Sequence, residues 1–319
     1  TVPFVGSVDV YKRQANSGHQ GTAMALAPLA HVLFTRVLRY SAKHPDWFNR
    51  DRFILSAGHA SILQYAMLHL TGYGLTMEDL KDFRQLDSLT PGHPETGHTA
   101  GVEVTTGPLG QGFANAVGMA ISERWLRAKF GSGNINHNVF VICGDGDLSE
   151  GISHEAASLA GNQQLGNLIC IYDDNHITID GPTELSLADD ASKRFEAYGW
   201  NVIDLGESGE DLDVLENALL EAKSNTSSPT IIILRTHIGH PSPTLTDSPS
   251  AHGYAFKDKE IFEVKELMGL PPEESFYVPS EVLDMYRAAG ERHQQEAEAY
   301  SWHAEDHMGR GTYPPHRIY

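Results

Sequence analysis

Between residues 138 and 236 the chain alternates short, uninterrupted apolar runs with segments whose apolar residues recur at helical spacing. The apolar runs predict strands, and the segments between them predict helices. Strands that are apolar along their whole length are typical of a parallel sheet buried on both faces. We therefore expect an α/β fold, a doubly wound, mainly parallel sheet with helices on both faces. The predicted strands are 138–144, 167–173, 201–205 and 229–236, and the predicted helices are 150–164, 187–199 and 210–224.

The region before residue 84 predicts two helices and one strand. A long helix is expected to begin after residues 16–19 and to run to Tyr40, and Pro28 within it predicts a kink or a break. Residues 53–55 predict a short strand. A second helix follows residues 56–59 and ends at the glycines near residue 72.

Two long polar segments, 84–112 and 237–256, interrupt this pattern. A loop of this length in a compact domain is usually either functional or disordered. Gly, Pro and Thr punctuate the first segment, without runs of charge, which favours function. A helix is predicted at 112–130, and two charged helices are predicted at 258–268 and 279–300.

The charge balance excludes some partners. The 319 residues include 23 Lys and Arg against 42 Asp and Glu, a net charge of −19. So acidic a surface repels phosphate backbones and anionic lipid, and we therefore expect neither nucleic acid nor a membrane surface as a partner. No window approaches the roughly 18 apolar residues of a transmembrane helix.

The two cysteines, Cys143 and Cys170, each lie inside an apolar run, so we expect two buried thiols and no disulfide framework. This usage suits a reducing compartment, and the first residues show no secretory signal, so we expect a cytoplasmic protein. Histidine is frequent, with 17 residues. Several histidines lie beside glycine in loops, and four of these are candidate functional residues: His19, His59, His93 and His252.

Polar residues follow two consecutive strands of the predicted sheet. Residues 144–147 read Gly-Asp-Gly-Asp, and residues 173–176 read Asp-Asp-Asn-His. In an open parallel sheet, ligands bind in the crevice beyond the carboxyl ends of the strands. A carboxylate, an amide oxygen and a backbone carbonyl are hard ligands for Mg²⁺ or Ca²⁺, which then takes water and substrate phosphates as further ligands.

The helix expected near residues 149–151 would point its N-terminus at the same crevice. Together these features predict a metal-bridged diphosphate site, in which the divalent ion reverses the local negative charge. Taken singly, the first motif is more often a tight turn and the second a helix cap. Their pairing at consecutive strand ends favours the diphosphate site.

These residues carry a resemblance to the transketolase family. Gly144, Asp145 and Gly146, followed after one helix and one strand by Asn175, resemble the thiamine diphosphate motif. The run 101–112 is the most specific, because it separates transketolase from related thiamine enzymes. Further segments resemble transketolase in the order in which that family has them: 17–19, 56–60, 91–95 and 172–179.

The resemblance is to the N-terminal half of transketolase and runs from Ala15 to about Trp302. It implies that residues 15–257 form the thiamine diphosphate-binding domain. Residues 258–319 would be a helical extension towards a pyrimidine-binding domain that the 319 residues do not include. Residues 1–14 are left as an unassigned tail.

The resemblance implies which residues bind the cofactor. Asp145, the side chain of Asn175 and the carbonyl of Ile177 would bind the metal, Mg²⁺ or Ca²⁺, and Gly144 would contact the diphosphate. The other cofactor contacts would be His59 and His252 at the diphosphate and Gly107 and Leu109 near the pyrimidine.

The resemblance also implies catalytic roles. His19, His93 and His252 would line the substrate channel and transfer protons, which suits histidine because it titrates near neutral pH. Glu150 would belong to a carboxylate network with a partner subunit. The expected reaction moves a two-carbon glycolaldehyde unit from a ketose phosphate to an aldose phosphate, in the pentose phosphate pathway.

Some positions depart from the family pattern. Gln20 stands where the family most often has proline, and residues 251–256 are bulkier after the glycine than is usual. The second half of the family, with the glutamate that activates the cofactor, is not in the 319 residues. We therefore expect a fragment or a split-enzyme subunit that is inactive alone, needs the second half in cis or in trans, and is a homodimer when complete.

The sequence alone leaves three alternative functions to consider. One is a dihydroxyacetone synthase-like transferase with a different acceptor. Another is a non-catalytic module for thiamine diphosphate binding or assembly, which would have little use for four histidines suited to proton transfer. A dinucleotide-binding oxidoreductase is disfavoured, because no Gly-x-Gly-x-x-Gly follows a predicted strand.

Overall fold

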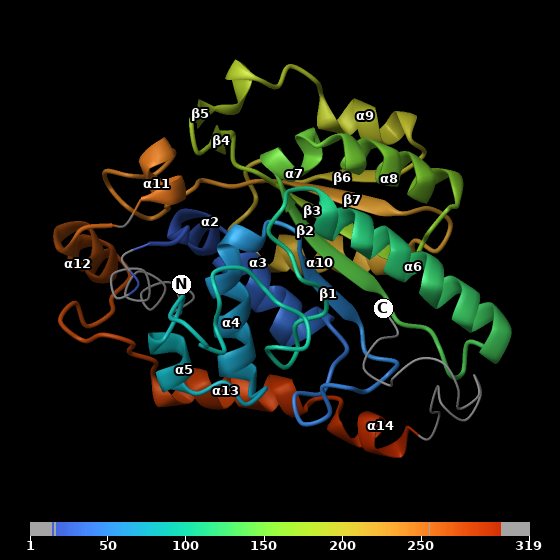
Figure 1. The fold of residues 1–319 in the computed structure, drawn as a ribbon, viewed down its shortest axis with the longest axis horizontal. Coiled ribbons are helices and arrows are strands. Elements are labelled where there is room, and N and C mark those ends of the chain that lie inside the picture. Colours follow the sequence, from blue (N-terminus) through green and yellow to red (C-terminus); the bar gives the residue numbers. More distant parts are fainter. Residues whose placement is uncertain (1–14, 16, 255, 301–319) are drawn as a thin grey trace.

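A computed structural model describes residues 15, 17–254 and 256–300. Its centre is a parallel sheet with the strand order β1-β2-β3-β7-β6 (Figure 1). All four strands predicted between residues 138 and 236, and the short one at 53–55, are present. The strands are β1 (Arg52–Leu55), β2 (Val139–Gly144), β3 (Leu168–Asp174), β6 (Asn201–Asp204) and β7 (Thr230–Arg235). The unassigned tail, 1–14, and the end of the predicted helical extension, 301–319, lie outside the described residues.

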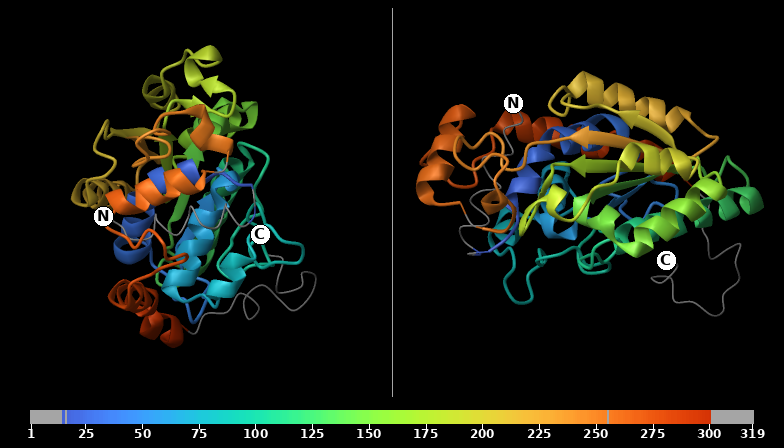
Figure 2. Two further views of the ribbon diagram at one scale, coloured as in Figure 1. Left: turned by 90° about the vertical axis from the view of Figure 1, so that its left-hand side faces the viewer. Right: turned by 90° about the horizontal axis from the view of Figure 1, so that it is seen from above.

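Helices cover both faces of the sheet, as the sequence predicts. Alternate strand residues belong to two separate cores: Ile54 and Val141 pack on one face, and Leu55 and Ile142 on the other. Seen from above, the sheet lies between the two helix layers (Figure 2). The first face carries α6 (Gln111–Phe130), α8 (Gly151–Asn162) and α9 (Ala191–Ala197); the second carries α2 (Gln20–Ala25), α3 (Ala27–Val32), α4 (Ser61–Thr71) and α10 (Leu212–Ser224).

The expectation of one long helix up to Tyr40 is wrong. The segment divides at Leu26 into α2 and α3, and a π-helical turn, Leu33–Val37, ends it. Pro28 lies in the first turn of α3, where its missing N–H breaks no hydrogen bond of that helix. The second helix, α4, ends as expected at Gly72, which has a φ of 98°.

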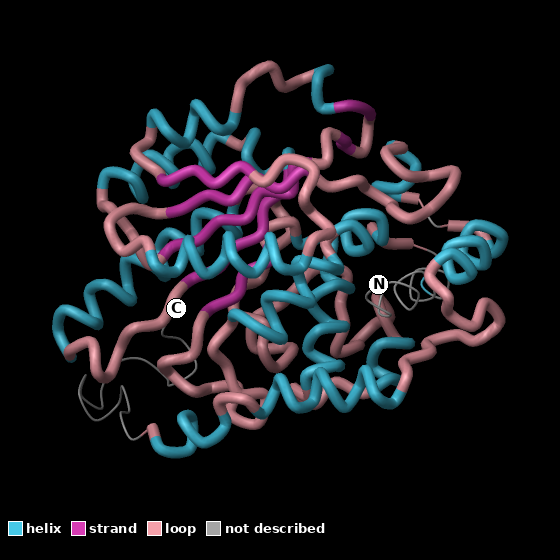
Figure 3. The backbone as a smooth tube through the Cα atoms, turned by 180° about the vertical axis from the view of Figure 1, so that it is seen from behind, coloured by secondary structure: helices cyan, strands magenta, loops and turns pink. Residues whose placement is uncertain are grey.

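Residues 258–300 pack against the helices of the second face. They form α12 (Asp258–Leu267), α13 (Ser280–Glu291) and α14 (Gln294–Ala299), so the helix predicted at 279–300 is interrupted at residues 292–293. Buried Tyr286 on α13 lies 2.8 Å from His31 Nδ1, within hydrogen-bond distance. Viewed from behind, the strands form one continuous layer with helices on either side (Figure 3).

The two thiols are buried and free, as expected, with 3.8 Å between their sulfur atoms. Burial raises the pKa of the Cys143 thiol well above its usual value. None of the helices in the described part of the chain is long and apolar enough to span a membrane.

Candidate functional site

The two predicted acidic turns meet at the carboxyl edge of the sheet. β2 and β3 are neighbours, and Gly144 at the end of β2 pairs with Asp173 near the end of β3. Directly after β2 the chain forms a single helical turn, α7 (Asp145–Ser149), which the sequence does not predict. Asp145 therefore begins α7 beside the end of β3.

Asp145 is buried, and only one of its carboxylate oxygens has a hydrogen-bond partner. The hydroxyl of Tyr172 donates to Oδ1 across 2.5 Å, and buried Oδ2 has no hydrogen-bond partner. Burial, followed by the charges of Asp173 and Asp174, raises the pKa of Asp145 to about 7, against the opposing hydrogen bond from Tyr172. A buried carboxylate oxygen without a donor is unfavourable, so a divalent cation fits this position.

Asn175 is also buried and is held by its own neighbours. Its amide nitrogen donates to Asp173 across 2.8 Å, and its Oδ1 accepts from the backbone N–H of Ile177 across 2.9 Å. Ile177 begins the short strand β4 (Ile177–Thr178), which pairs with β5 (Gly181–Pro182). An amide oxygen has two lone pairs, so Oδ1 keeps one for a metal ion.

Within the described residues, no three or more His, Cys, Asp or Glu side chains are grouped so as to hold a metal ion. The predicted ligands contain one carboxylate, one amide and one backbone carbonyl. An ion bound there would therefore need further oxygens from water or from a ligand, as is typical of Mg²⁺ with phosphates.

Three of the four predicted histidines form one cluster. The ring centroids lie 5.0 Å apart for His19 and His59, 5.1 Å for His59 and His252, and 5.5 Å for His19 and His252. His19 directly precedes α2, without a capping hydrogen bond from its side chain, and His252 lies on a short helix, α11 (Pro249–Gly253), within the second long loop. Burial, then the charges of His252, His19 and His93, lowers the pKa of His59 well below 6.5, so this ring is neutral at pH 7.

His93 lies within the first long loop, next to Gly107 of the same loop. A Cβ on Gly107 would lie 3.6 Å from the His93 ring, and Gly107 has a φ of 154°, which favours glycine. Burial, followed by the charge of Arg84, lowers the pKa of His93. The predicted catalytic and cofactor-binding residues of this loop are thus close together.

The same loop packs on α7. A Cβ on Gly146 would lie 2.9 Å from the side chain of Leu109, so glycine at 146 lets Leu109 lie over the turn. Glu150 is exposed and lies at the junction of α7 and α8. The structure thus places the predicted residues on loops that meet at one end of the sheet.

Asp147 is a buried residue that the sequence motifs do not mark as part of the site. Its carboxylate accepts hydrogen bonds from Ser56, Gly110 and Gly144. Only its place directly after the glycine of the motif could have drawn attention to it, because its partners are far away in the sequence.

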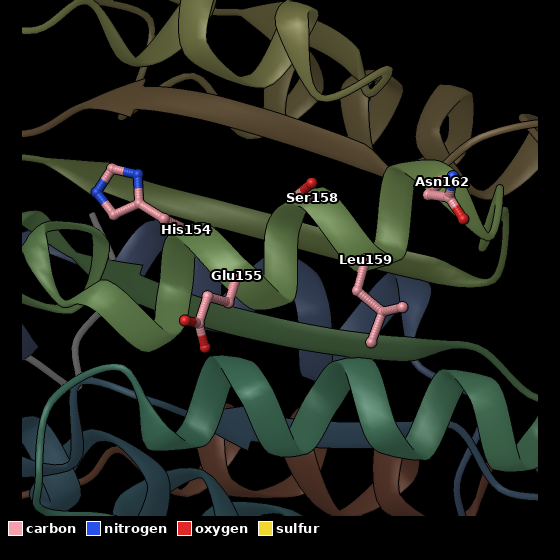
Figure 4. Close-up of a pocket in the computed structure, with 5 residues that line it drawn as sticks. All are labelled: His154, Glu155, Ser158, Leu159 and Asn162. Carbon is pink, nitrogen blue, oxygen red and sulfur yellow. The ribbon is translucent and has the colours of Figure 1, made fainter.

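One hollow lies at this end of the sheet, and another lies on the surface of a single helix. A cavity of about 260 Å³ borders Asp145, Tyr172, Asp174 and His176. A hollow of about 570 Å³ lies on the outer side of α8 (Figure 4), and its lining residues, His154, Glu155, Ser158, Leu159 and Asn162, all come from that helix. Convergent polar groups from several elements are typical of a ligand site, which favours the first cavity.

Comparison with known sequences gives one family. Residues 5–313 match the family described as "Transketolase, thiamine diphosphate binding domain". A transketolase from Nostoc sp. is 51% identical over 290 residues, which are 90% of this chain and 43% of that relative. A transketolase from Bacillus subtilis is 48% identical over 315 residues, 97% of this chain and 46% of that relative. The chain therefore spans about half the length of the curated relatives it matches.

Comparison with solved structures agrees. A transketolase from Leishmania mexicana superposes with a TM-score of 0.91 at 43% identity and covers 93% of this chain, which corresponds to 45% of that protein. A transketolase from Pichia stipitis, solved in complex with sedoheptulose-7-phosphate, also has a TM-score of 0.91 at 43% identity, over 94% of this chain and 44% of that protein.

Proposed function

Because the chain belongs to the transketolase family, we propose that it binds thiamine diphosphate and a divalent metal ion, Mg²⁺ or Ca²⁺, for two-carbon transfer from a ketose phosphate to an aldose phosphate. The observation that supports this most is Asp145 Oδ2, a buried carboxylate oxygen without a hydrogen-bond partner, next to the end of β3. A cation at this oxygen would satisfy it and would bind the diphosphate in an acidic chain.

In this proposal, Asp145, Asn175 and the carbonyl of Ile177 hold the metal, and Gly144 contacts the diphosphate. His59 and His252 donate hydrogen bonds to diphosphate oxygens. For His59 this fits a buried ring whose pKa is lowered, because a neutral imidazole still carries one N–H donor. Gly107 and Leu109 would lie near the pyrimidine end of the cofactor.

When bound, thiamine diphosphate would supply the electron sink for cleaving the carbon–carbon bond next to a ketose carbonyl. His19, His93 and His252 would accept and return protons at substrate hydroxyl oxygens. Their separate loops meet in one place, so they can serve different hydroxyl groups of one substrate. Sugar phosphates as substrates are supported by the Pichia stipitis structures with sedoheptulose-7-phosphate and fructose-6-phosphate.

We further propose that activity requires a second half, joined in cis or supplied in trans, and that the complete enzyme is a homodimer in which Glu150 faces the partner subunit. The chain spans about half the length of its relatives, which supports this proposal. The test measures ketose-to-aldose transfer by the 319-residue polypeptide alone and after fusion to the remaining part of the Bacillus subtilis relative. We expect turnover only in the fusion; turnover by the polypeptide alone would contradict the need for a second half.

A further inference from the structure

The carboxylate of Asp147 joins three segments of the site. It is fully buried, and its Oδ1 accepts from the Ser56 hydroxyl across 2.6 Å and from the Gly110 N–H across 2.8 Å. Its Oδ2 accepts from the Gly144 N–H across 3.0 Å. The three donors belong to the loop before His59, the loop of Gly107 and Leu109, and the turn of Asp145.

The three segments also pack closely, with no room for a side chain at the glycines between them. A Cβ on Gly112 would lie 2.5 Å from the Cα of Ser56, and a Cβ on Gly110 would lie 2.9 Å from the Cβ of Glu150. Ser56 Oγ accepts in turn from the N–H of Phe113, at the start of α6, across 3.0 Å. A shift of one segment is therefore passed to the other two.

We propose that Asp147 is a positioning residue that fixes the metal-binding turn and the pyrimidine-side loop relative to each other. This inference rests on the proposed function. All three partners are donors, so the position requires a side chain that only accepts hydrogen bonds. An amide would present N–H groups to at least one of these donors, although its shape is nearly the same.

The test compares Asp147→Asn with Asp51→Asn in the fused enzyme described above. Asp51 is a matched control, because it is also buried and accepts from two backbone N–H groups, those of Arg39 and Asn138, outside the proposed site. Both variants should lower the melting temperature. Only Asp147→Asn should also weaken thiamine diphosphate binding in Mg²⁺, by about 10- to 100-fold in calorimetry well below the melting temperature.

Two further variants separate a failure of this inference from a failure of the proposed function. Ser56→Ala removes one donor and should weaken binding by a smaller factor, with no added loss in the Asp147→Asn background. It replaces Asp147→Asn as the test if that variant does not fold. Asp145→Ala tests the proposed function itself.

Unchanged cofactor affinity in Asp147→Asn, or in Ser56→Ala if it stands in, together with lost binding in Asp145→Ala, would overturn the positioning role and leave the proposed function standing. Retained binding in Asp145→Ala would overturn the proposed function and this inference with it. An equal loss of affinity in Asp51→Asn would also overturn the inference, because general destabilisation would then explain the effect.

Discussion

Tyr172 donates its hydroxyl hydrogen to Oδ1 of Asp145 across 2.5 Å, from the strand next to the one that Asp145 follows. Burial, together with the charge of Asp145, raises the pKa of Tyr172 far above its usual value, so the tyrosine remains a donor at every physiological pH. The contact fixes one carboxylate oxygen and leaves the other, Oδ2, buried without a partner. A metal ion bound there would meet a carboxylate that is already oriented.

The Asp145 carboxylate should lower the stability of the cofactor-free chain but should be required for cofactor binding. In the cofactor-free chain at pH 8, Asp145→Asn should raise the free energy of unfolding by about 1 kcal/mol, since it removes a buried charged oxygen that lacks a donor. In the fused enzyme the same variant should lose Mg²⁺-dependent thiamine diphosphate binding. Chemical denaturation and calorimetry measure the two effects.

The control for this prediction is Asp204→Asn. Asp204 borders the same cavity but is exposed, so its variant should change stability by less than about 0.5 kcal/mol and leave binding unchanged. Loss of stability in Asp145→Asn, or unchanged cofactor affinity, would count against the metal role of Asp145.

The buried histidine cluster should make the cofactor-free chain less stable below pH 6.5. The pKa of His59 is well below 6.5 in the fold because of burial and then the neighbouring histidines. Between pH 6.5 and that lower value, the unfolded chain binds a proton that the folded chain does not, so stability falls as the pH falls. His59→Gln should flatten this decline in urea midpoints between pH 7.5 and 5.5.

His237 provides the opposite case. Hydrogen bonding to Asp247 first, and to Glu207 as well, raises its pKa above 6.5. Its contribution to stability is complete below pH 6.5 and is lost as the pH rises through the raised value. His237→Gln should therefore make the decline steeper as the pH falls from that raised value to 6.5, and should leave the slope below pH 6.5 unchanged. The same slope in both variants and in the unmodified chain would refute this reading of the two histidines.

His93 and His59 should separate turnover from cofactor binding. In the fused enzyme, His93→Ala should reduce kcat by about 100-fold or more with little change in thiamine diphosphate affinity, because its proposed role is proton transfer. His59→Ala should mainly weaken cofactor binding. The roles would be reversed if His93→Ala lost cofactor binding but turned over normally at saturating cofactor.

Two glycines of the helices over one face of the sheet should respond oppositely to alanine. No atom lies within 4 Å of a Cβ on Gly118 in α6, so Gly118→Ala should raise stability by about 0.5–1 kcal/mol. A Cβ on Gly161 in α8 would lie 1.8 Å from the carbonyl oxygen of Tyr198, so Gly161→Ala should lower stability by about 1–3 kcal/mol. Urea denaturation of both variants checks the α6–α8 layer; equal effects would contradict its packing.

The strands of the large sheet could be predicted from the sequence, but the shortest helices could not. The strands were predictable because β2, β3 and β7 each contain an uninterrupted apolar run, which is typical of buried parallel strands. α7 and α11 each have five residues, too few to show a helical period. The break at Leu26 depends on where the chain must turn onto the sheet, which Pro28 only indicates.

The site was predictable from local motifs only in part. Asp145 and Asn175 stand at strand ends, so parallel pairing was enough to bring their segments together. That His19, His59 and His252 meet followed from the family resemblance, because nothing in their own segments specifies the contact. Asp147 was missed because Ser56 is 91 positions away and Gly110 is 37 positions away.

The most direct test of the account is a crystal structure of the fused enzyme with thiamine diphosphate and Ca²⁺, in which anomalous scattering locates the ion. We predict one ion at about 2.3–2.6 Å from Oδ2 of Asp145, Oδ1 of Asn175 and the carbonyl of Ile177, with diphosphate oxygens completing its ligands. An ion bound elsewhere, or Asp145 and Asn175 side chains that share no ion, would contradict the account.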